Sequence, residues 1–273
     1  MALPTVDQQR ITPEAVAMNA ATDTPYVLKT SVVGLVTLTL NRGERFNPLS
    51  LAMIGALERE LDLVQQDDTV RVVVLAATGR GFSAGHDLRE LRDHVDDVAW
   101  QRELFTSCAR MMLKLTRLRV PVVARVHGIA TAAGCQLVSM CDLAIANSQA
   151  RFALPGVSIG LFCSTPAVGV VRNVGRKRAM EMLLTGDMID AAVAAQWGLI
   201  NRVVTPEQLD AEVASLAAQI MKRSARVIEL GKRAFYSQAE LDVAAAYDLA
   251  SEAMVTNLQL DDAQAGIEAF FKK

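Results

Sequence analysis

Residues 126–142, with the sequence VHGIATAAGCQLVSMCD, join a predicted strand to the helix that follows it. The small residues from Ala130 to Gly134 let another group approach the backbone closely. The first N–H groups of a helix are unpaired donors at the positive end of its dipole. Such a junction can hold a developing oxyanion, or it can simply let a helix pack tightly on a sheet. A second stretch of the same kind is needed to decide between these interpretations.

A second loop of small residues lies upstream, in GRGFSAGHDL at 79–88. It follows directly on the apolar run from Val70 to Ala77, whose β-branched residues predict a short strand buried on both faces. The chain therefore contains two small-residue loops that each follow a strand. Together they favour a functional site built from backbone groups.

Strands and helices alternate over most of the chain, which is the pattern of an α/β fold. Strands are predicted at 31–40, 70–77, 122–126, 143–146, 151–153 and 199–204. Helices are predicted from Ser50 to about residue 65 and at 88–118, 166–184 and 191–197. Thr205-Pro206-Glu207-Gln208 begins another helix with a capping box, and almost everything beyond it is helical.

The chain is predicted to have three parts. Residues 1–24 carry Pro4 and Pro13 and show no sustained periodicity, so we expect a loosely ordered N-terminal arm. Residues 25–204 form the α/β core, and residues 205–273 form a helical C-terminal region.

Composition and charge exclude several functional classes. The chain has 273 residues, of which 51% are hydrophobic, enough for a sizeable core. Its net charge of -2 argues against a nucleic-acid binder, because neutralising phosphates requires a concentrated basic surface. No apolar run reaches the roughly 18 residues of a membrane span, so no membrane partner is expected. The cysteines lack the spacing of a metal site or disulfide framework, and without a recognisable signal peptide the cytoplasm is the predicted location.

The segment Gly81-Phe82-Ser83-Ala84-Gly85 matches the G-x-S-x-G turn that carries the nucleophile of serine hydrolases. Those enzymes place their catalytic histidine late in the chain, whereas the last histidine here is His127. The glycine spacing of the same loop also departs from the nucleotide-binding G-x-G-x-x-G and P-loop patterns. A serine hydrolase is therefore kept only as an alternative, which labelling of Ser83 by a serine-directed probe would favour.

The two loops together resemble those of the crotonase superfamily, also called the enoyl-CoA hydratase/isomerase family. The segments GHDL at 85–88, ATAAGCQLVSMCD at 130–142 and LPGVSIGLFCSTP at 154–166 are most similar to its branch called enoyl-CoA hydratase domain-containing protein 3. The resemblance runs from about Pro25 to the C-terminus. It implies a crotonase-like core that is a spiral of ββα turns, and a C-terminal helical oligomerisation region that forms a homotrimer, often paired into a homohexamer.

In this family, two backbone N–H groups hold the thioester oxygen of an acyl-CoA or enoyl-CoA substrate. The resemblance assigns these N–H groups to His86 and Ala133, and the ring of His86 is not expected to take part. Coenzyme A (CoA) enters only as part of the substrate, and no permanently bound cofactor or metal is expected. The residues expected to contact CoA are Arg45, Phe46, Arg80, Ser83, Ala84, His86, Asp87, Leu88 and Arg89, where arginine suits the phosphates. Lys232 and Phe235 are weaker candidates for the same contact.

The resemblance fails at the two glutamates with which hydratases of the family activate water. The corresponding positions hold Gln136 and Gly156. An amide cannot take a proton near neutral pH, and glycine has no side chain. Each missing acid or base is worth about 10²–10⁴ in rate, so weak hydration is expected. Restoring both carboxylates should raise hydration, unless a positive φ at Gly156 strains any side chain there.

Two functions stay open from the sequence. We favour an acyl-CoA enzyme that runs hydration or another enolate-type reaction, with a replacement base from Cys163, Ser164, Thr165 or Asp142. The alternative is a CoA-thioester binding protein of the same fold that has lost catalysis. The buried character of cysteine and the structural role of this aspartate in the family weigh against two of these replacements.

Overall fold

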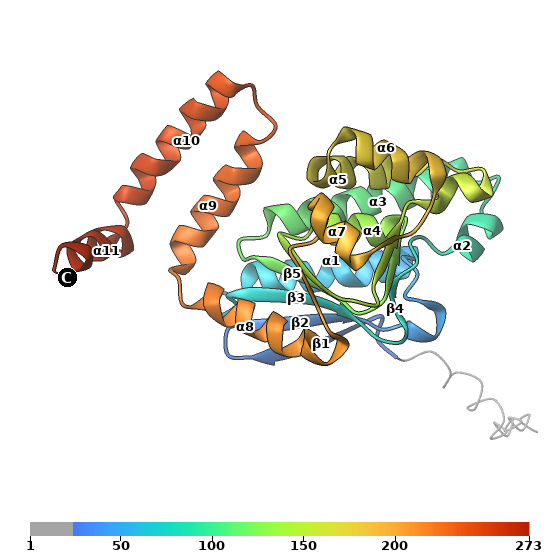
Figure 1. The fold of residues 1–273 in the computed structure, drawn as a ribbon, viewed down its shortest axis with the longest axis horizontal. Coiled ribbons are helices and arrows are strands. Elements are labelled where there is room, and N and C mark those ends of the chain that lie inside the picture. Colours follow the sequence, from blue (N-terminus) through green and yellow to red (C-terminus); the bar gives the residue numbers. More distant parts are fainter. Residues whose placement is uncertain (1–23, 273) are drawn as a thin grey trace, which may run out of the picture.

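The computed structural model describes residues 24–272, and two β-sheets lie at its centre (Figure 1). The larger sheet has the strand order β1-β2-β3-β5-β7-β10, and the smaller has the order β4-β6-β8-β9. The larger sheet is made of β1 (Val27–Val32), β2 (Leu35–Leu40), β3 (Val72–Ala77), β5 (Val122–Val126), β7 (Leu143–Asn147) and β10 (Arg202–Val204). The smaller is made of β4 (Gly81–Ser83), β6 (Ile129–Thr131), β8 (Arg151–Ala153) and β9 (Ile189–Asp190).

From β3 to β8, successive strands alternate between the two sheets. β3, β5 and β7 run parallel in the larger sheet, and the strand that follows each of them joins the smaller sheet, where β4, β6 and β8 are also parallel. Helices α2 (Leu88–Asp93) and α3 (Val98–Arg117) follow β4, and α4 (Ala133–Met140) follows β6. This arrangement is the predicted spiral of ββα turns, so the crotonase-like α/β fold class is confirmed.

Strand β3 is buried on both faces, as its apolar run predicts. Its alternate side chains enter two different layers of the core. Val73 and Leu75 pack in the main cluster, which includes residues of α3 and of α1 (Leu51–Gln66). Val72 and Val74 pack on the opposite face, in a cluster with residues of α8 (Leu209–Met221).

Two segments predicted as single helices are each divided. The segment 88–118 forms α2 and α3, and the Asp97 side chain caps the start of α3 by accepting a hydrogen bond from Trp100 N. The segment 166–184 forms α5 (Ser164–Val174) and α6 (Arg176–Thr185), which meet at Gly175 with a φ of 80°. A glycine adopts this positive φ without strain, so the chain can turn between two helices there.

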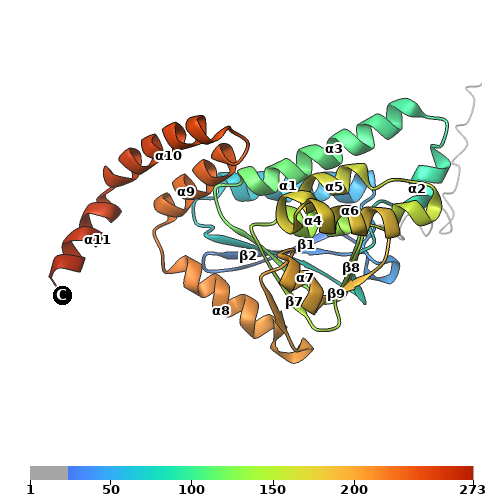
Figure 2. The ribbon, with the colours of Figure 1, turned by 45° about the horizontal axis from the view of Figure 1, so that its top comes forward.

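The C-terminal region is helical, as predicted, but its helices differ in what they contact. After α7 (Ala191–Trp197) and the short 3-10 turn Pro206–Gln208, α8 lies on the core sheet. Of the next three helices, α9 (Ala225–Gln238) lies beside the core, whereas α10 (Val243–Leu258) and α11 (Asp261–Phe271) extend away from it (Figures 1 and 2). None of their residues is buried. The predicted boundary at Thr205 therefore groups one helix that packs on the sheet with three that do not.

The predicted N-terminal arm, residues 1–24, lies outside the described residues except for Thr24. Among residues 24–272, no helix is both long enough and apolar enough to cross a membrane.

Candidate functional site

The two small-residue loops lie against each other at the end of the smaller sheet. A Cβ atom added to Gly85 would lie 3.0 Å from Ala133 N and 2.9 Å from Ala132 Cβ. A Cβ atom added to Gly134 would lie only 2.2 Å from Ser83 O. The glycines therefore allow an approach between the two backbones that other residues would block.

Ala132, at the start of α4, has an unusual backbone conformation. Its φ is 48° and its ψ is -121°, outside the regions that a residue with a side chain adopts readily. Such a conformation costs about 1–3 kcal/mol and persists only where the surroundings enforce it. Here it turns the chain sharply from β6 into α4, so that Ala133 is the first helical residue. The N–H of a first helical residue has no acceptor inside its own helix.

His86 is held by its ring. Nδ1 lies 3.1 Å from the Leu49 carbonyl oxygen, and because a carbonyl only accepts, Nδ1 must carry the proton. The ring also packs edge-on against Phe105, with a centroid separation of 5.3 Å. Burial lowers the pKa of His86, so the imidazole is neutral near pH 7. The backbone N–H of His86 donates to no acceptor among the described residues.

Several residues expected to contact CoA gather beside the first loop. Arg45 forms an ion pair with Asp87 at 2.9 Å, and Asp87 also caps α2 by accepting a hydrogen bond from Arg89 N. The guanidinium of Arg80 lies 5.4 Å from the centre of the Phe46 ring, a cation–π contact. Arg80, Ala84, Leu88 and Arg89 are exposed.

Ser83 does not fit the role of a nucleophile or of a CoA-binding side chain. It is completely buried, and its hydroxyl donates a hydrogen bond to the Asn47 carbonyl oxygen at 2.9 Å. A hydroxyl held in this way cannot reach a substrate, so the serine hydrolase alternative is wrong. Because the whole residue is buried, neither its side chain nor its backbone is exposed for a contact with CoA.

Asn47 organises the site, although no sequence motif singled it out. The residue is fully buried with a φ of 48°. Its Oδ1 accepts from Arg42 N at 2.8 Å, and its Nδ2 donates to Thr78 O and Gly81 O at 2.9 and 3.0 Å. These bonds fasten the segment with Arg45 to the first loop. The sequence held one signal for this role. Asn47 precedes a proline, and asparagine tolerates the positive φ that tight turns need.

The two positions of the family's glutamates differ in their surroundings. Gln136 is 5% exposed, and within residues 24–272 no hydrogen-bond partner reaches its side-chain oxygen. Gly156 is buried in the 3-10 turn Pro155–Ile159. Its φ is not positive, so the strain considered from the sequence is absent. The obstacle is instead the following loop, because a Cβ atom on Gly156 would lie 2.6 Å from Leu161 O and 2.9 Å from Cys163 Sγ.

The candidate replacement bases are poorly suited to take a proton. Burial raises the pKa of Cys163, so its thiol is protonated near neutral pH. Ser164 begins α5, and its hydroxyl points back to Phe162 O at 3.4 Å. Asp142 accepts hydrogen bonds from Val122 N at 2.6 Å and from Tyr236 OH at 2.9 Å, and it pairs with Lys232 at 2.6 Å. Asp142 is therefore a structural residue that joins α9 to the core.

Lys232 is committed to the same contact. Its ammonium group also donates to Leu115 O and Val120 O, each at 2.9 Å, and its side chain is 7% exposed. The idea that Lys232 contacts CoA is therefore wrong in the described chain. Phe235, one helical turn away, is exposed and stays available for a partner.

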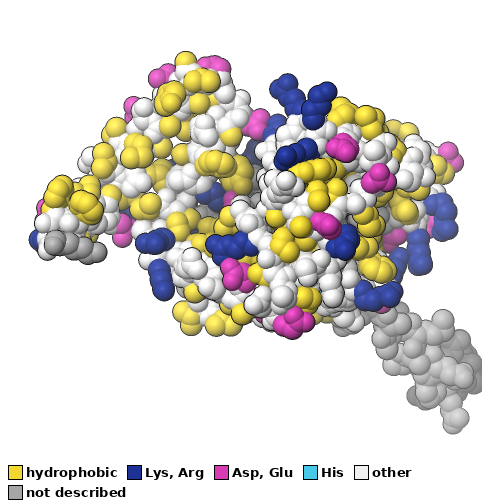
Figure 3. All heavy atoms as spheres, viewed as in Figure 1, with side chains coloured by type: hydrophobic (Ala, Val, Ile, Leu, Met, Phe, Trp, Pro, Cys, Tyr) yellow, Lys and Arg dark blue, Asp and Glu magenta, His cyan; other side chains and the backbone are white. Residues whose placement is uncertain are grey.

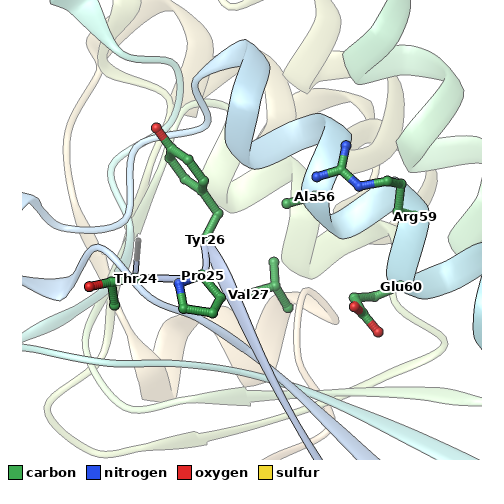
Figure 4. A pocket seen from close by; sticks show the side chains of 7 residues that line it. All are labelled: Thr24, Pro25, Tyr26, Val27, Ala56, Arg59 and Glu60. Carbon is green, nitrogen blue, oxygen red and sulfur yellow. The ribbon is translucent and has the colours of Figure 1, made fainter. Parts of the chain in front are cut away.

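Two cavities lie away from the two loops. One, of 310 Å³, separates the start of β1 from α1 and is lined by Thr24, Pro25, Tyr26, Val27, Ala56, Arg59 and Glu60 (Figure 4). The other, of 660 Å³, lies between α9 and α11 and is mostly apolar. None of the residues assigned to the oxyanion site or to CoA binding lines either cavity.

Comparison with known proteins identifies the chain's relatives. Residues 30–273 match the profile of the enoyl-CoA hydratase/isomerase family. The chain belongs to this family. It is 46% identical over 240 residues to mouse enoyl-CoA hydratase domain-containing protein 3, mitochondrial, covering 88% of this chain and 80% of the relative. The predicted superfamily and branch are thus confirmed.

Two solved structures extend the match to three dimensions. An enoyl-CoA hydratase from Mycobacterium smegmatis superposes with a TM-score of 0.89 at 48% identity, covering 91% of this chain and 97% of the other. Human enoyl-CoA hydratase domain-containing protein 3 superposes with a TM-score of 0.87 at 41% identity, covering 90% and 97%. The mouse relative is named as a mitochondrial protein. The cytoplasmic location of the present protein therefore stays a prediction.

Proposed function

We propose that this crotonase-family protein binds an acyl-CoA or enoyl-CoA thioester with its carbonyl oxygen between the backbone N–H groups of His86 and Ala133. The observation that carries the proposal is the close approach of the two loops at Gly85. A Cβ atom added to Gly85 would lie 3.0 Å from Ala133 N. Two fixed N–H donors aimed at one oxygen stabilise the negative charge that develops on it in an enolate. The free N–H of His86 and the helix start at Ala133 support this role.

The CoA part of the ligand is proposed to lie along the first loop. Arg45, Arg80 and Arg89 supply positive charge for its phosphates, and Phe46 supplies an aromatic face. Arg45 already pairs with Asp87. Binding of a CoA phosphate at Arg45 would therefore replace Asp87 as its anionic partner.

Hydration by the unmodified protein is expected to be weak. Gln136 supplies an amide where a carboxylate is needed, and the loop at Leu161 fills the space beside Gly156. We expect crotonyl-CoA hydration at least about 100-fold below that of a family member with both glutamates, since each acid or base is worth 10²–10⁴. Turnover of a panel of enoyl- and acyl-CoA thioesters, with products identified by mass spectrometry, tests this. Robust hydration that survives Gln136→Ala would contradict it.

Restoring the missing acids should succeed at one position only. Gln136→Glu places a carboxylate at the end of the first turn of α4 and should raise crotonyl-CoA hydration above that of the parent. Gly156→Glu should instead lower the melting temperature, because its Cβ would clash with the backbone at Leu161. The sequence-based expectation that both carboxylates can be restored together is revised accordingly.

A CoA-thioester binding protein without catalysis is the second candidate function. The neutral amide of Gln136 and the absent side chain at Gly156 favour it, since neither can move a proton. Tight binding of the whole thioester panel without any product would establish this function in place of the first.

We further propose that the protein is a homotrimer or homohexamer held together by its C-terminal helices. Exposed hydrophobic side chains form a stripe on α10, made of Val243, Tyr247, Met254 and Leu258. Viewed down the helix axis, these four positions fall within about one fifth of the circumference. Figure 3 shows hydrophobic side chains spread over the outer surface of these helices. A monomer rarely leaves so large an apolar area in water.

The double variant Tyr247→Glu/Met254→Glu should dissociate the assembly, because it places two charges in the stripe. Light scattering should then report a monomer, whereas the parent is an oligomer at micromolar concentration. Thr256→Glu adds a charge at an exposed position on the other side of the same helix and should leave the oligomer intact. A parent that is already monomeric would refute the proposal.

A further inference from the structure

Gln136 is the one polar side chain at the two positions where relatives carry glutamates, and its amide is not engaged. The residue is 5% exposed, and Oε1 has no hydrogen-bond partner. The hydrogen bonds at this residue use its backbone: Gln136 N donates to Ala132 O, and Gln136 O accepts from Ser139 Oγ at 2.7 Å. Buried polar groups in folded proteins almost always have a partner.

Helix geometry indicates the direction of the Gln136 side chain along α4. Side chains in an α-helix lean toward the N-terminus and lie over the preceding turn. The preceding turn of α4 begins at Ala133, three residues earlier and on the same face. The amide of Gln136 therefore lies on the side of the helix where the proposed thioester oxygen would be held.

The surroundings of Gln136 leave its side-chain oxygen without a hydrogen-bond partner among the described residues. Its neighbours in α4 from Ala133 to Ser139 are all buried, and most are apolar or small. If the site held only hydrocarbon acyl chains, a hydrocarbon side chain at this position would be favoured. Such a side chain would fill the space without burying an unpaired amide. The amide is neutral and can both donate and accept hydrogen bonds. It therefore suits an oxygen substituent rather than a proton transfer.

We propose that Gln136 is a specificity-determining residue that selects thioesters whose acyl group carries a hydroxyl or carbonyl oxygen close to the thioester. This inference rests on the proposed function, because it places the thioester oxygen at His86 and Ala133. Such a group would complete the hydrogen bonding of the buried amide. A hydrocarbon chain would leave the amide unpaired, which disfavours its binding by roughly tenfold or more.

The test compares three thioesters of equal chain length: butyryl-CoA, 3-hydroxybutyryl-CoA and acetoacetyl-CoA. Their dissociation constants are measured by calorimetry on the full chain and on Gln136→Met, which keeps the length of the side chain and removes the amide. The parent should bind at least one of the two oxygenated thioesters about tenfold more tightly than butyryl-CoA. Gln136→Met should bind butyryl-CoA at least as well as the parent and should lose the preference.

Thermal unfolding supplies an independent readout. Without ligand, Gln136→Met should melt at a higher temperature than the parent, because it no longer buries an unpaired amide. Gln219→Met, at an exposed glutamine of α8, is the matched control and should leave both the preference and the melting temperature unchanged.

The possible outcomes separate the inference from the proposed function. If the parent binds all three thioesters equally, or if Gln136→Met retains the preference, the specificity role is wrong while the thioester site stands. If the parent binds none of the three, the proposed function fails, and the inference fails with it.

Discussion

Replacing Ala133 with proline will lower turnover of any thioester substrate by about 100-fold or more, the usual effect of removing one oxyanion donor. Proline has no N–H, yet its fixed φ suits the first position of a helix, so α4 should still form. The parent and the variant are compared by steady-state kinetics on the best thioester of the panel. If the protein only binds thioesters, affinity is measured instead, and a loss of about tenfold is expected for one neutral hydrogen bond.

Two controls separate the missing N–H from a disturbed fold. Ala133→Gly keeps the backbone donor and removes only the Cβ atom, so it should retain most of the activity. His86→Ala likewise keeps its N–H and should matter far less than Ala133→Pro, because the neutral ring serves to hold the loop through Leu49. An Ala133→Pro variant that unfolds like the parent and acts like the parent would show that the oxyanion assignment is wrong.

Replacing Lys232 with methionine will destabilise the protein by about 3–5 kcal/mol, because it leaves the buried Asp142 carboxylate without its cationic partner. Burial already raises the pKa of Asp142 and lowers that of Lys232, and their mutual attraction opposes both shifts. Urea denaturation measures the loss. In Asp142→Asn/Lys232→Met both charges are gone, and part of the stability should return, because no unpaired charge stays buried.

A second ion pair between the core and the C-terminal region gives the matched control. Arg172 on α5 pairs with Glu240, just after α9, at 2.9 Å, but both side chains are more than half exposed. Exposed pairs contribute about 0–1 kcal/mol, so Arg172→Met should cost little. Equal losses for Lys232→Met and Arg172→Met would mean that the buried pair does not anchor α9.

The sequence predicted those parts of the fold that local patterns encode. The apolar run from Val70 to Ala77 predicted a strand buried on both faces, and the small residues around Gly85 and Gly134 predicted two loops that each follow a strand. Of the smaller sheet, only β8 was predicted, as the strand at 151–153. Its strands have two or three residues, too few to show a periodicity, and they exist because the spiral brings them together.

The sequence was least informative about contacts between distant residues. Asp142 and Lys232 are 90 positions apart, and no local pattern joins an aspartate after one helix to a lysine on another. Gly156 was recognised as a missing acid, but the backbone of Leu161 that fills the space could only be seen in three dimensions. The role of Ser83 was also decided by burial, which its motif did not reveal.

The absence of buried residues in α9, α10 and α11 has a consequence for how the protein folds. Residues up to the end of α8 contain both apolar clusters and can complete their core while the last three helices are still being synthesised. Amide hydrogens of α10 and α11, which no buried ion pair anchors to the core, should then exchange with solvent quickly in a dilute sample and slowly in a concentrated one, whereas the exchange of β3 should not depend on concentration. The protection of the C-terminal helices from exchange would in this way measure the fraction of chains that have associated.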